Sequence, residues 1–141
     1  LDLGCGTGIL AMAIARRWRR SVLAADIDPD AVATTRINAR LNGLEHLVRA
    51  VGGNGPARGV VRRNGPYSLI VANILARPLI VMAQDIKRSL VPGGTLILSG
   101  FTANQGNAVR AAYPRRDYHL ARKEDSDGWT TFVLTRFRWK N

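Results

Sequence analysis

Two patterns of hydrophobic residues alternate along this chain, one typical of buried strands and one typical of helices. Short, uninterrupted apolar runs predict buried parallel strands at residues 1–3, 21–25, 47–51, 67–72 and 95–99. Between these runs, apolar residues spaced three or four positions apart predict helices at 9–19, 29–42, 78–90 and 103–113. Strands that alternate with helices indicate an α/β fold with a mainly parallel, twisted sheet and helices on both faces.

The sequence also predicts where the helices begin and end and which of their residues are buried. Asp28 before Pro29 is typical of an N-cap, and Gly43 is typical of a helix end in the left-handed conformation. Residues 92–94, Pro-Gly-Gly, are expected to stop the helix at 78–90 and turn into the next strand. The first helix is expected to bury Ile9, Ala13, Ile14 and Trp18, and the helix at 78–90 to bury Leu79, Met82, Ala83, Ile86 and Leu90.

Two further segments complete the expected fold. Residues 52–66 contain five glycines and two prolines, which indicates a loop or at most a fragment of helix. Strands at 118–122 and 129–137 have no helix between them, so they predict an antiparallel pair at one edge, with 124–128 as the hairpin turn. No internal repeat is visible, and residues 1–141 are interpreted as one domain whose first strand lacks its beginning.

Composition narrows the class of protein. A chain of 141 residues with 46% hydrophobic residues can bury a core of its own. No apolar run reaches the length of a membrane span, about 18 residues, and no secretory signal opens the chain. The single cysteine, Cys5, excludes an internal disulfide and a multi-cysteine metal site. We therefore expect a cytoplasmic protein without a metal.

The net charge of +11 is unusual, and 18 of the 21 basic residues are arginine. Such a surface suits phosphate-rich or acidic partners, such as RNA. The plainer interpretation, which we favour for charge alone, is that arginines solvate the helix faces.

The candidate ligand site is the glycine turn that follows the first strand. Gly4, Gly6 and Gly8 permit positive φ and let a ligand approach the backbone at the carboxyl end of a parallel strand. The spacing does not match G-x-G-x-x-G, because the last position is Ile9, and no lysine follows as in a P-loop. The pattern D-x-G-x-G-x-G instead matches a loop for S-adenosylmethionine, with Asp2 available to the methionine ammonium.

A second acidic residue supports the same ligand. Asp26 follows the second strand, where a carboxylate can accept both ribose hydroxyls of a bound nucleoside. Asp28, two residues later, is better explained as the N-cap before Pro29.

Four segments in order, LDLGCGTGILAMAIA, ADIDPDAVATTRINARLNG, LIVANILARPL and PGGTLILSG, resemble the PrmA family. Its members methylate large-subunit ribosomal protein eleven. Similarity continues through Gln105, through the run from Val109 to Tyr113, and from Trp129 to Arg136. The resemblance implies a Rossmann-like class I methyltransferase and, upstream of Leu1, a substrate-recognition domain and linker.

The resemblance also implies residue roles. It assigns cofactor contacts to Gly4, Asp26 and Asn73. Together with the rest of the glycine turn and Ile27, the residues expected to contact S-adenosylmethionine are Asp2, Gly4, Cys5, Gly6, Thr7, Gly8, Asp26, Ile27 and Asn73. Asn73 and the Ile74 carbonyl, at the end of the fourth strand, would orient the acceptor nitrogen in the way that Asn-Pro-Pro motifs do in N-methyltransferases. An in-line methyl transfer needs a neutral amine and alignment more than acid–base groups. The alternative for Asn73 is a cap on the next helix.

Two other residue types are less promising as catalysts. Cys5 lies inside the glycine turn, which favours a small packed side chain over a nucleophile. His46 and His119 are interpreted as structural or exposed.

Three functions remain open at this stage. The favoured one is N-methylation of lysine or N-terminal amines of ribosomal protein eleven. An RNA or small-molecule amine methyltransferase would share the glycine loop and Asp26, although NILA in place of NPP[YF] disfavours a flipped base. A cofactor-binding fragment without activity of its own is the third.

Overall fold

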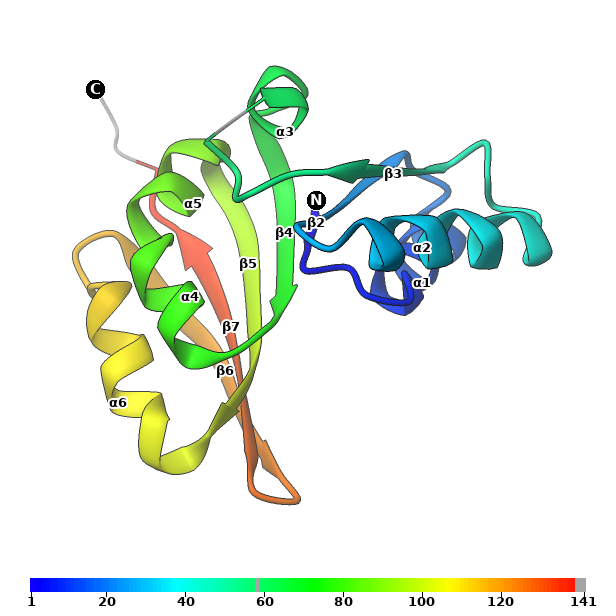
Figure 1. The fold of residues 1–141 in the computed structure, drawn as a ribbon. Coiled ribbons are helices and arrows are strands. Elements are labelled where there is room, and N and C mark those ends of the chain that lie inside the picture. The colour runs from blue at the N-terminus through cyan, green and yellow to red at the C-terminus, as the bar shows by residue number, and fades with distance from the viewer. Residues whose placement is uncertain (58, 139–141) are drawn as a thin grey trace. The chain divides into compact units, whose positions relative to one another are not determined.

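The computed structural model describes residues 1–57 and 59–138. The chain consists of two compact units, residues 1–64 and 65–141. Each unit is described on its own (Figure 1).

The first unit is a small parallel sheet in the order β3-β2-β1 with its connecting helices. Asp2 pairs with Ala24, and Val22 pairs with Val48, both in parallel register. The order follows from two successive strand–helix–strand connections, as the hydrophobic pattern predicts. The elements are β1 (Asp2–Leu3), α1 (Ile9–Trp18), β2 (Val22–Asp26), α2 (Pro29–Leu41), β3 (Val48–Gly52) and α3 (Gly59–Arg63).

The ends of α2 agree with the sequence. Asp28 is the N-cap, its side chain accepting a hydrogen bond from the Asp30 amide at 2.9 Å, and Pro29 opens the helix. Gly43 has φ +65°, which confirms the left-handed residue after the helix. The described residues of the glycine-rich stretch 52–66 contain one short helix, α3, which agrees with the predicted loop or fragment of helix.

The predicted buried face of α1 is wrong. Ile9 is 67% exposed and Trp18 54% exposed, Ala13 is exposed, and only Ile14 is partly buried. The residues that enter the core are Ala11 and Ala15, with Met12 and Ile14 beside them. Small side chains let α1 pack closely on the strands, so the face of the helix cannot be chosen by side-chain size.

The second unit has strands in the order β4-β5-β7-β6. The β4–β5 pair is parallel, whereas β7 is antiparallel to both β5 and β6, so the predicted antiparallel edge is confirmed. Figure 1 shows α4, α5 and α6 gathered beside these strands. The elements are β4 (Tyr67–Asn73), α4 (Ala76–Val81), α5 (Ala83–Ser89), β5 (Leu90–Thr102), α6 (Ala103–Ala112), β6 (Tyr118–Ser126) and β7 (Trp129–Arg136).

The single helix predicted at 78–90 is two helices broken at Met82. Leu79, Ala83, Ile86 and Leu90 are buried as predicted, but Met82 is only partly buried and Leu90 already belongs to β5. The Pro-Gly-Gly sequence therefore does not stop the helix. It lies within β5, in the irregular stretch where Tyr67 pairs with Leu90 and Leu69 with Thr95. Proline and glycine are tolerated there because a bulge needs no regular ladder.

The hairpin turn is shorter than predicted. Strand β6 continues to Ser126, and the turn is made by Asp127 and Gly128, both with positive φ. Two consecutive positive-φ residues are typical of a two-residue turn that matches strand twist.

Polar contacts join the helices of the second unit to one another, to the segment before β6 and to β7. The Tyr113 hydroxyl donates to the Leu79 carbonyl at 2.8 Å, tying the end of α6 to α4. Lys87 pairs with the buried Asp117 at 2.7 Å, and the Arg136 guanidinium donates to the Lys87 carbonyl at 2.7 Å.

Within the described residues, no helix is long and apolar enough to cross a bilayer.

Candidate functional site

The glycine turn links β1 to α1 and is hydrogen-bonded to β2. The amides of Gly4 and Cys5 donate to the Ala25 carbonyl at 2.8 and 3.2 Å. Gly4, Gly6 and Gly8 have φ of +69°, +53° and +79°, a region that favours glycine, as the sequence predicts. An atom at the Cβ position of Gly6 would meet nothing within 4 Å, so the turn presents open backbone.

Asp26 braces this turn. Its Oδ2 accepts from the Gly6 amide at 2.9 Å, and its Oδ1 accepts from the Asp28 amide at 3.0 Å. Each carboxylate oxygen has two lone pairs, so each retains one for a further donor. The side chain is only partly buried, and this remaining capacity fits a pair of ligand hydroxyls.

Asp2 is the most unusual group in the first unit. It is 1% exposed; its Oδ2 accepts from the Ala11 amide at 3.0 Å, while Oδ1 has no partner within the described residues. Burial raises the pKa of Asp2 to about 6, assisted by the negative charge of Asp26 and opposed by the Ala11 hydrogen bond. A buried carboxylate with an orphaned oxygen fits a ligand ammonium.

We expect the free energy of unfolding to depend on pH because of the ionisation of Asp2. The native pKa of Asp2, about 6, lies above the ordinary 3.8, so the Asp2 contribution to the free energy of unfolding falls as pH rises from about 4 to about 6. At pH 7 the difference corresponds to about 3 kcal/mol. Urea unfolding of the wild type and Asp2→Asn should therefore show the variant more stable at pH 7, with the gap closing near pH 4. A gap that does not depend on pH would contradict the raised pKa.

Helix α2 contains residues that sequence reasoning missed. The buried Thr35 hydroxyl donates to the Gly6 carbonyl at 3.0 Å, and Asn38 Nδ2 donates to the Thr7 carbonyl at 2.8 Å. A Cβ on Gly8 would lie 2.7 Å from Thr35 Cγ2, so the third glycine allows α2 to approach the turn. A polar residue on the buried stripe between Val32 and Ala39 is the signal that could have revealed Thr35.

The remaining predicted ligand residues of this unit fall into two groups. The Cys5 thiol is buried in the core at 3.3 Å from Thr35 Oγ1, and burial raises its pKa. Thr7 and Ile27 are exposed, Ile27 at 72%. The structure thus gives Cys5 the packing role expected of it.

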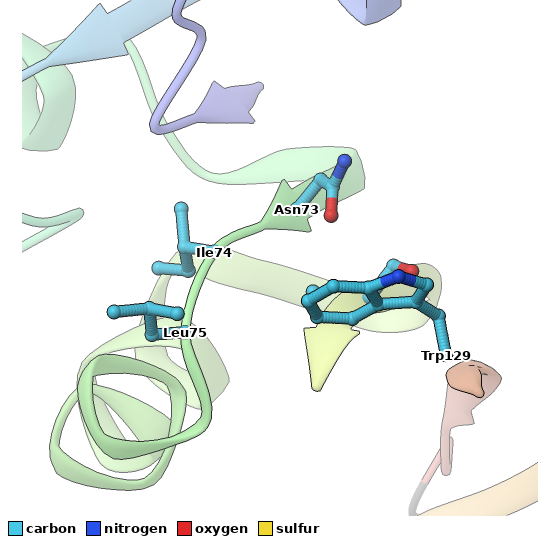
Figure 2. Close-up of a pocket in the computed structure, with 6 residues that line it drawn as sticks. Asn73, Ile74, Leu75 and Trp129 are labelled. Atoms are coloured by element: carbon cyan, nitrogen blue, oxygen red, sulfur yellow. The ribbon is translucent and has the colours of Figure 1, made fainter. Parts of the chain in front are cut away.

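The second unit contains a pocket of about 480 Å³ at the end of β4. Figure 2 shows the Trp129 indole ring standing opposite the segment from Asn73 to Leu75. The N-cap of α4 is Leu75, without a side-chain cap, and Asn73 makes no side-chain hydrogen bond within the described residues. Asn73 therefore does not cap the next helix. All the lining residues are uncharged: Asn73, Ile74, Leu75, Ser99, Gly100 and Trp129.

Gly100 fixes the backbone beside this pocket. It lies where the β5–β7 register shifts between Leu98 and Phe101, and its φ is +86°. A Cβ there would lie 2.6 Å from the Ile74 carbonyl oxygen and 2.9 Å from Asn73 Oδ1. The Ile74 amide also donates to the Ser99 carbonyl at 3.2 Å. This close approach, which the sequence did not reveal, sets the positions of two oxygen acceptors.

The other candidate groups lie elsewhere. His46 is exposed between α2 and β3, and His119 is exposed on β6. Among residues 1–57 and 59–138, no group of three or more histidine, cysteine or acidic residues could hold a metal ion.

Comparison with known proteins gives the family. A family model described as ribosomal protein L11 methyltransferase (PrmA) matches residues 1–137. The chain belongs to this family. It is 45% identical over 136 residues to the ribosomal protein L11 methyltransferase of Caulobacter sp. (strain K31), covering 96% of this chain and 46% of that protein. The one from Brucella abortus (strain S19) is 46% identical over 136 residues, covering 96% and 47%. This PrmA-family chain thus spans about half the length of the curated relatives it matches.

Solved structures confirm the predicted fold class. A ribosomal protein L11 methylase from Lactobacillus delbrueckii subsp. bulgaricus superposes with a TM-score of 0.84 at 29% identity, covering 97% of this chain and 69% of that one. An RNA methyltransferase from Salinibacter ruber, solved with S-adenosyl-L-homocysteine, gives 0.75 at 21% identity over 99% and 81%. The second likeness shows the fold alone. The PrmA-family chain has the Rossmann-like methyltransferase fold.

Proposed function

We propose that this protein is an S-adenosylmethionine-dependent N-methyltransferase that modifies lysine or N-terminal amino groups of ribosomal protein L11. The observation that carries the proposal is the family match over residues 1–137. The buried carboxylate of Asp2, the open glycine turn and the partly free oxygens of Asp26 support this donor. The buried free thiol of Cys5 suits the cytoplasm, where we place the reaction.

The first unit would hold the methyl donor. Asp2 Oδ1 would accept from its ammonium, Asp26 would accept from its ribose hydroxyls, and exposed Ile27 would offer an apolar contact beside Asp26. The turn formed by Gly4, Cys5, Gly6, Thr7 and Gly8 would lie against it, with open backbone at Gly6. When bound, S-adenosylmethionine supplies an electrophilic methyl group.

The second unit would orient the acceptor. Asn73 Oδ1 and the Ile74 carbonyl oxygen would each accept an N–H of the substrate amine, which points its lone pair in one direction. A lysine ammonium must lose a proton before it reacts. The uncharged pocket walls give the ammonium no counter-ion, and the exposed Trp129 and Leu75 offer apolar contact to its methylenes. Partial desolvation lowers the amine pKa and favours the reactive form.

The deciding experiment is a methyl-transfer assay of the protein at its full natural length. Purified ribosomal proteins and ribosomal RNA are offered separately with labelled methyl donor, and products are identified by mass spectrometry. We expect label in L11, on nitrogen. Label only in RNA would replace the proposal with an RNA methyltransferase, and no label despite donor binding would favour a cofactor-binding protein without activity.

An Asn73 variant distinguishes a role in orienting the acceptor amine from a role in binding the methyl donor. We expect Asn73→Ala to lower kcat about 100-fold, because the lost acceptor lets the amine rotate away from alignment. The affinity for S-adenosylhomocysteine, measured by calorimetry, should change less than about threefold, because neither the transferred methyl group nor the acceptor amine of the substrate is present in that complex. Equal losses in turnover and in affinity would argue against a role in orienting the acceptor.

A further inference from the structure

The first unit is electrically polarised along its strands. Its acidic residues are Asp2, Asp26, Asp28, Asp30 and Glu45, and the first four lie in β1, at the carboxyl end of β2 or in the turn that opens α2. The opposite end of the sheet, where β2 and β3 begin, is rich in arginine. Helices α1 and α2 both finish there, since each leads into the amino terminus of a strand. The four acidic residues and this group of arginines thus lie at opposite ends of the strands, whereas Arg36 lies within α2 and Arg62 and Arg63 lie in α3.

We call this opposite surface the arginine end, consisting of Arg16, Arg17, Trp18, Arg19, Arg20 and Arg40. At this end β2 and β3 begin side by side. The Val22 amide, at the start of β2, donates to the carbonyl of Leu47, just before β3, at 2.8 Å. All six side chains are exposed, and within the described residues none of the five arginines has a carboxylate within ion-pair distance. Glu45 is the acidic residue of the unit at this end.

Helix stability alone does not account for the arrangement. Basic residues in a last turn favour the helix dipole, which accounts for Arg16 and Arg17 of α1 and Arg40 of α2. Arg19 and Arg20 lie beyond the last helical residue, and Arg19 adopts φ +52°, which costs an arginine more than a glycine. Trp18, between Arg17 and Arg19 in the sequence, is 54% exposed, although a large aromatic ring gains most by burial.

We propose that the arginine end binds RNA, with guanidinium groups on phosphates and the Trp18 ring stacked on an unpaired base. Arginine matches phosphate geometry in a bidentate manner, and aromatic side chains interleaved with basic ones bind single-stranded nucleotides by stacking. The contact would leave the glycine turn free, because that turn lies at the other end of the strands. RNA here is a binding partner, independent of which molecule receives the methyl group.

The test measures RNA binding by the full chain without any methyl donor. The probe is a fluorescein-labelled, unstructured RNA of about twelve nucleotides, followed by anisotropy at several salt concentrations. Arg17→Gln with Arg20→Gln should weaken binding about tenfold or more at low salt, and should reduce the slope of log K against log salt by about 1.4. Glutamine is a good helix former, so α1 should persist, as circular dichroism would verify.

The matched control is Arg115→Gln with Arg116→Gln, two exposed arginines of the second unit. It removes the same two charges from +11. We expect its RNA affinity to change less than about twofold. RNA should also quench tryptophan fluorescence in the wild type and not in Trp18→Leu. Equal losses in both double variants, quenching that survives Trp18→Leu, or binding to anionic lipid vesicles without binding to RNA would each overturn the proposal.

Discussion

Gly100→Ala should lower turnover by about 100-fold while S-adenosylhomocysteine still binds normally. The added methyl group would lie 2.6 Å from the Ile74 carbonyl oxygen and 2.9 Å from Asn73 Oδ1. Both oxygens must move for the methyl group to fit, and these are the atoms that we propose orient the acceptor amine. The measurement is steady-state kinetics on L11 alongside calorimetry with S-adenosylhomocysteine.

The control for this variant is Gly128→Ala. Gly128 has φ +81°, close to the +86° of Gly100, but a Cβ there would meet nothing within 4 Å. Both variants therefore carry the same backbone strain, about 1–2 kcal/mol, and only one disturbs the pocket. Urea unfolding should show a loss of stability in both variants, and a larger one in Gly100→Ala, where the clash with Ile74 adds to the backbone strain. If both variants keep wild-type turnover, or both lose it equally, Gly100 does not set the positions of the acceptor oxygens.

The second large effect is expected at Asp26. Asp26→Ala should weaken S-adenosylhomocysteine binding by at least about 100-fold, because charge-assisted hydrogen bonds to the ribose are lost. It also frees the Gly6 and Asp28 amides, which now donate to the carboxylate at 2.9 and 3.0 Å. Part of the loss would therefore come from a loosened glycine turn, and the measurement is isothermal calorimetry.

Asp26→Asn separates the two causes. Its amide oxygen can still accept from Gly6 or Asp28, so the turn keeps part of its support while the charge and one acceptor are gone. We expect an affinity between those of the wild type and Asp26→Ala, with amide hydrogen exchange at Gly6 slowed relative to Asp26→Ala. Unchanged affinity in Asp26→Ala would refute the ribose role altogether.

The elements that the sequence predicted well are those governed by local chemistry. Apolar runs marked every strand of the parallel part, although β5 extends beyond the predicted residues 95–99 at both ends, and the Asp28–Pro29 pair marked the start of α2. The positive φ of the glycine turn was predictable because few other residues adopt it. These features depend on neighbours in sequence, which the pattern contains.

The features that were missed depend on contacts between distant residues. The inward face of α1 is set by how closely Ala11 and Ala15 approach the strands, not by the larger Ile9 and Trp18. The hydrogen bond from Thr35 to Gly6 and the approach of Gly100 to Ile74 each join segments more than twenty residues apart. No local pattern encodes such distances, although glycine after an apolar strand and threonine on a buried stripe are hints.

The buried carboxylate of Asp2 has a consequence for the lifetime of the protein. An uncompensated charge in the core makes the ligand-free molecule less stable than its packing would allow, and a bound ammonium would remove that penalty. Resistance to heat and to proteases would then rise with the concentration of methyl donor, as mass action requires. The abundance of the protein in a cell would follow the supply of its own cosubstrate.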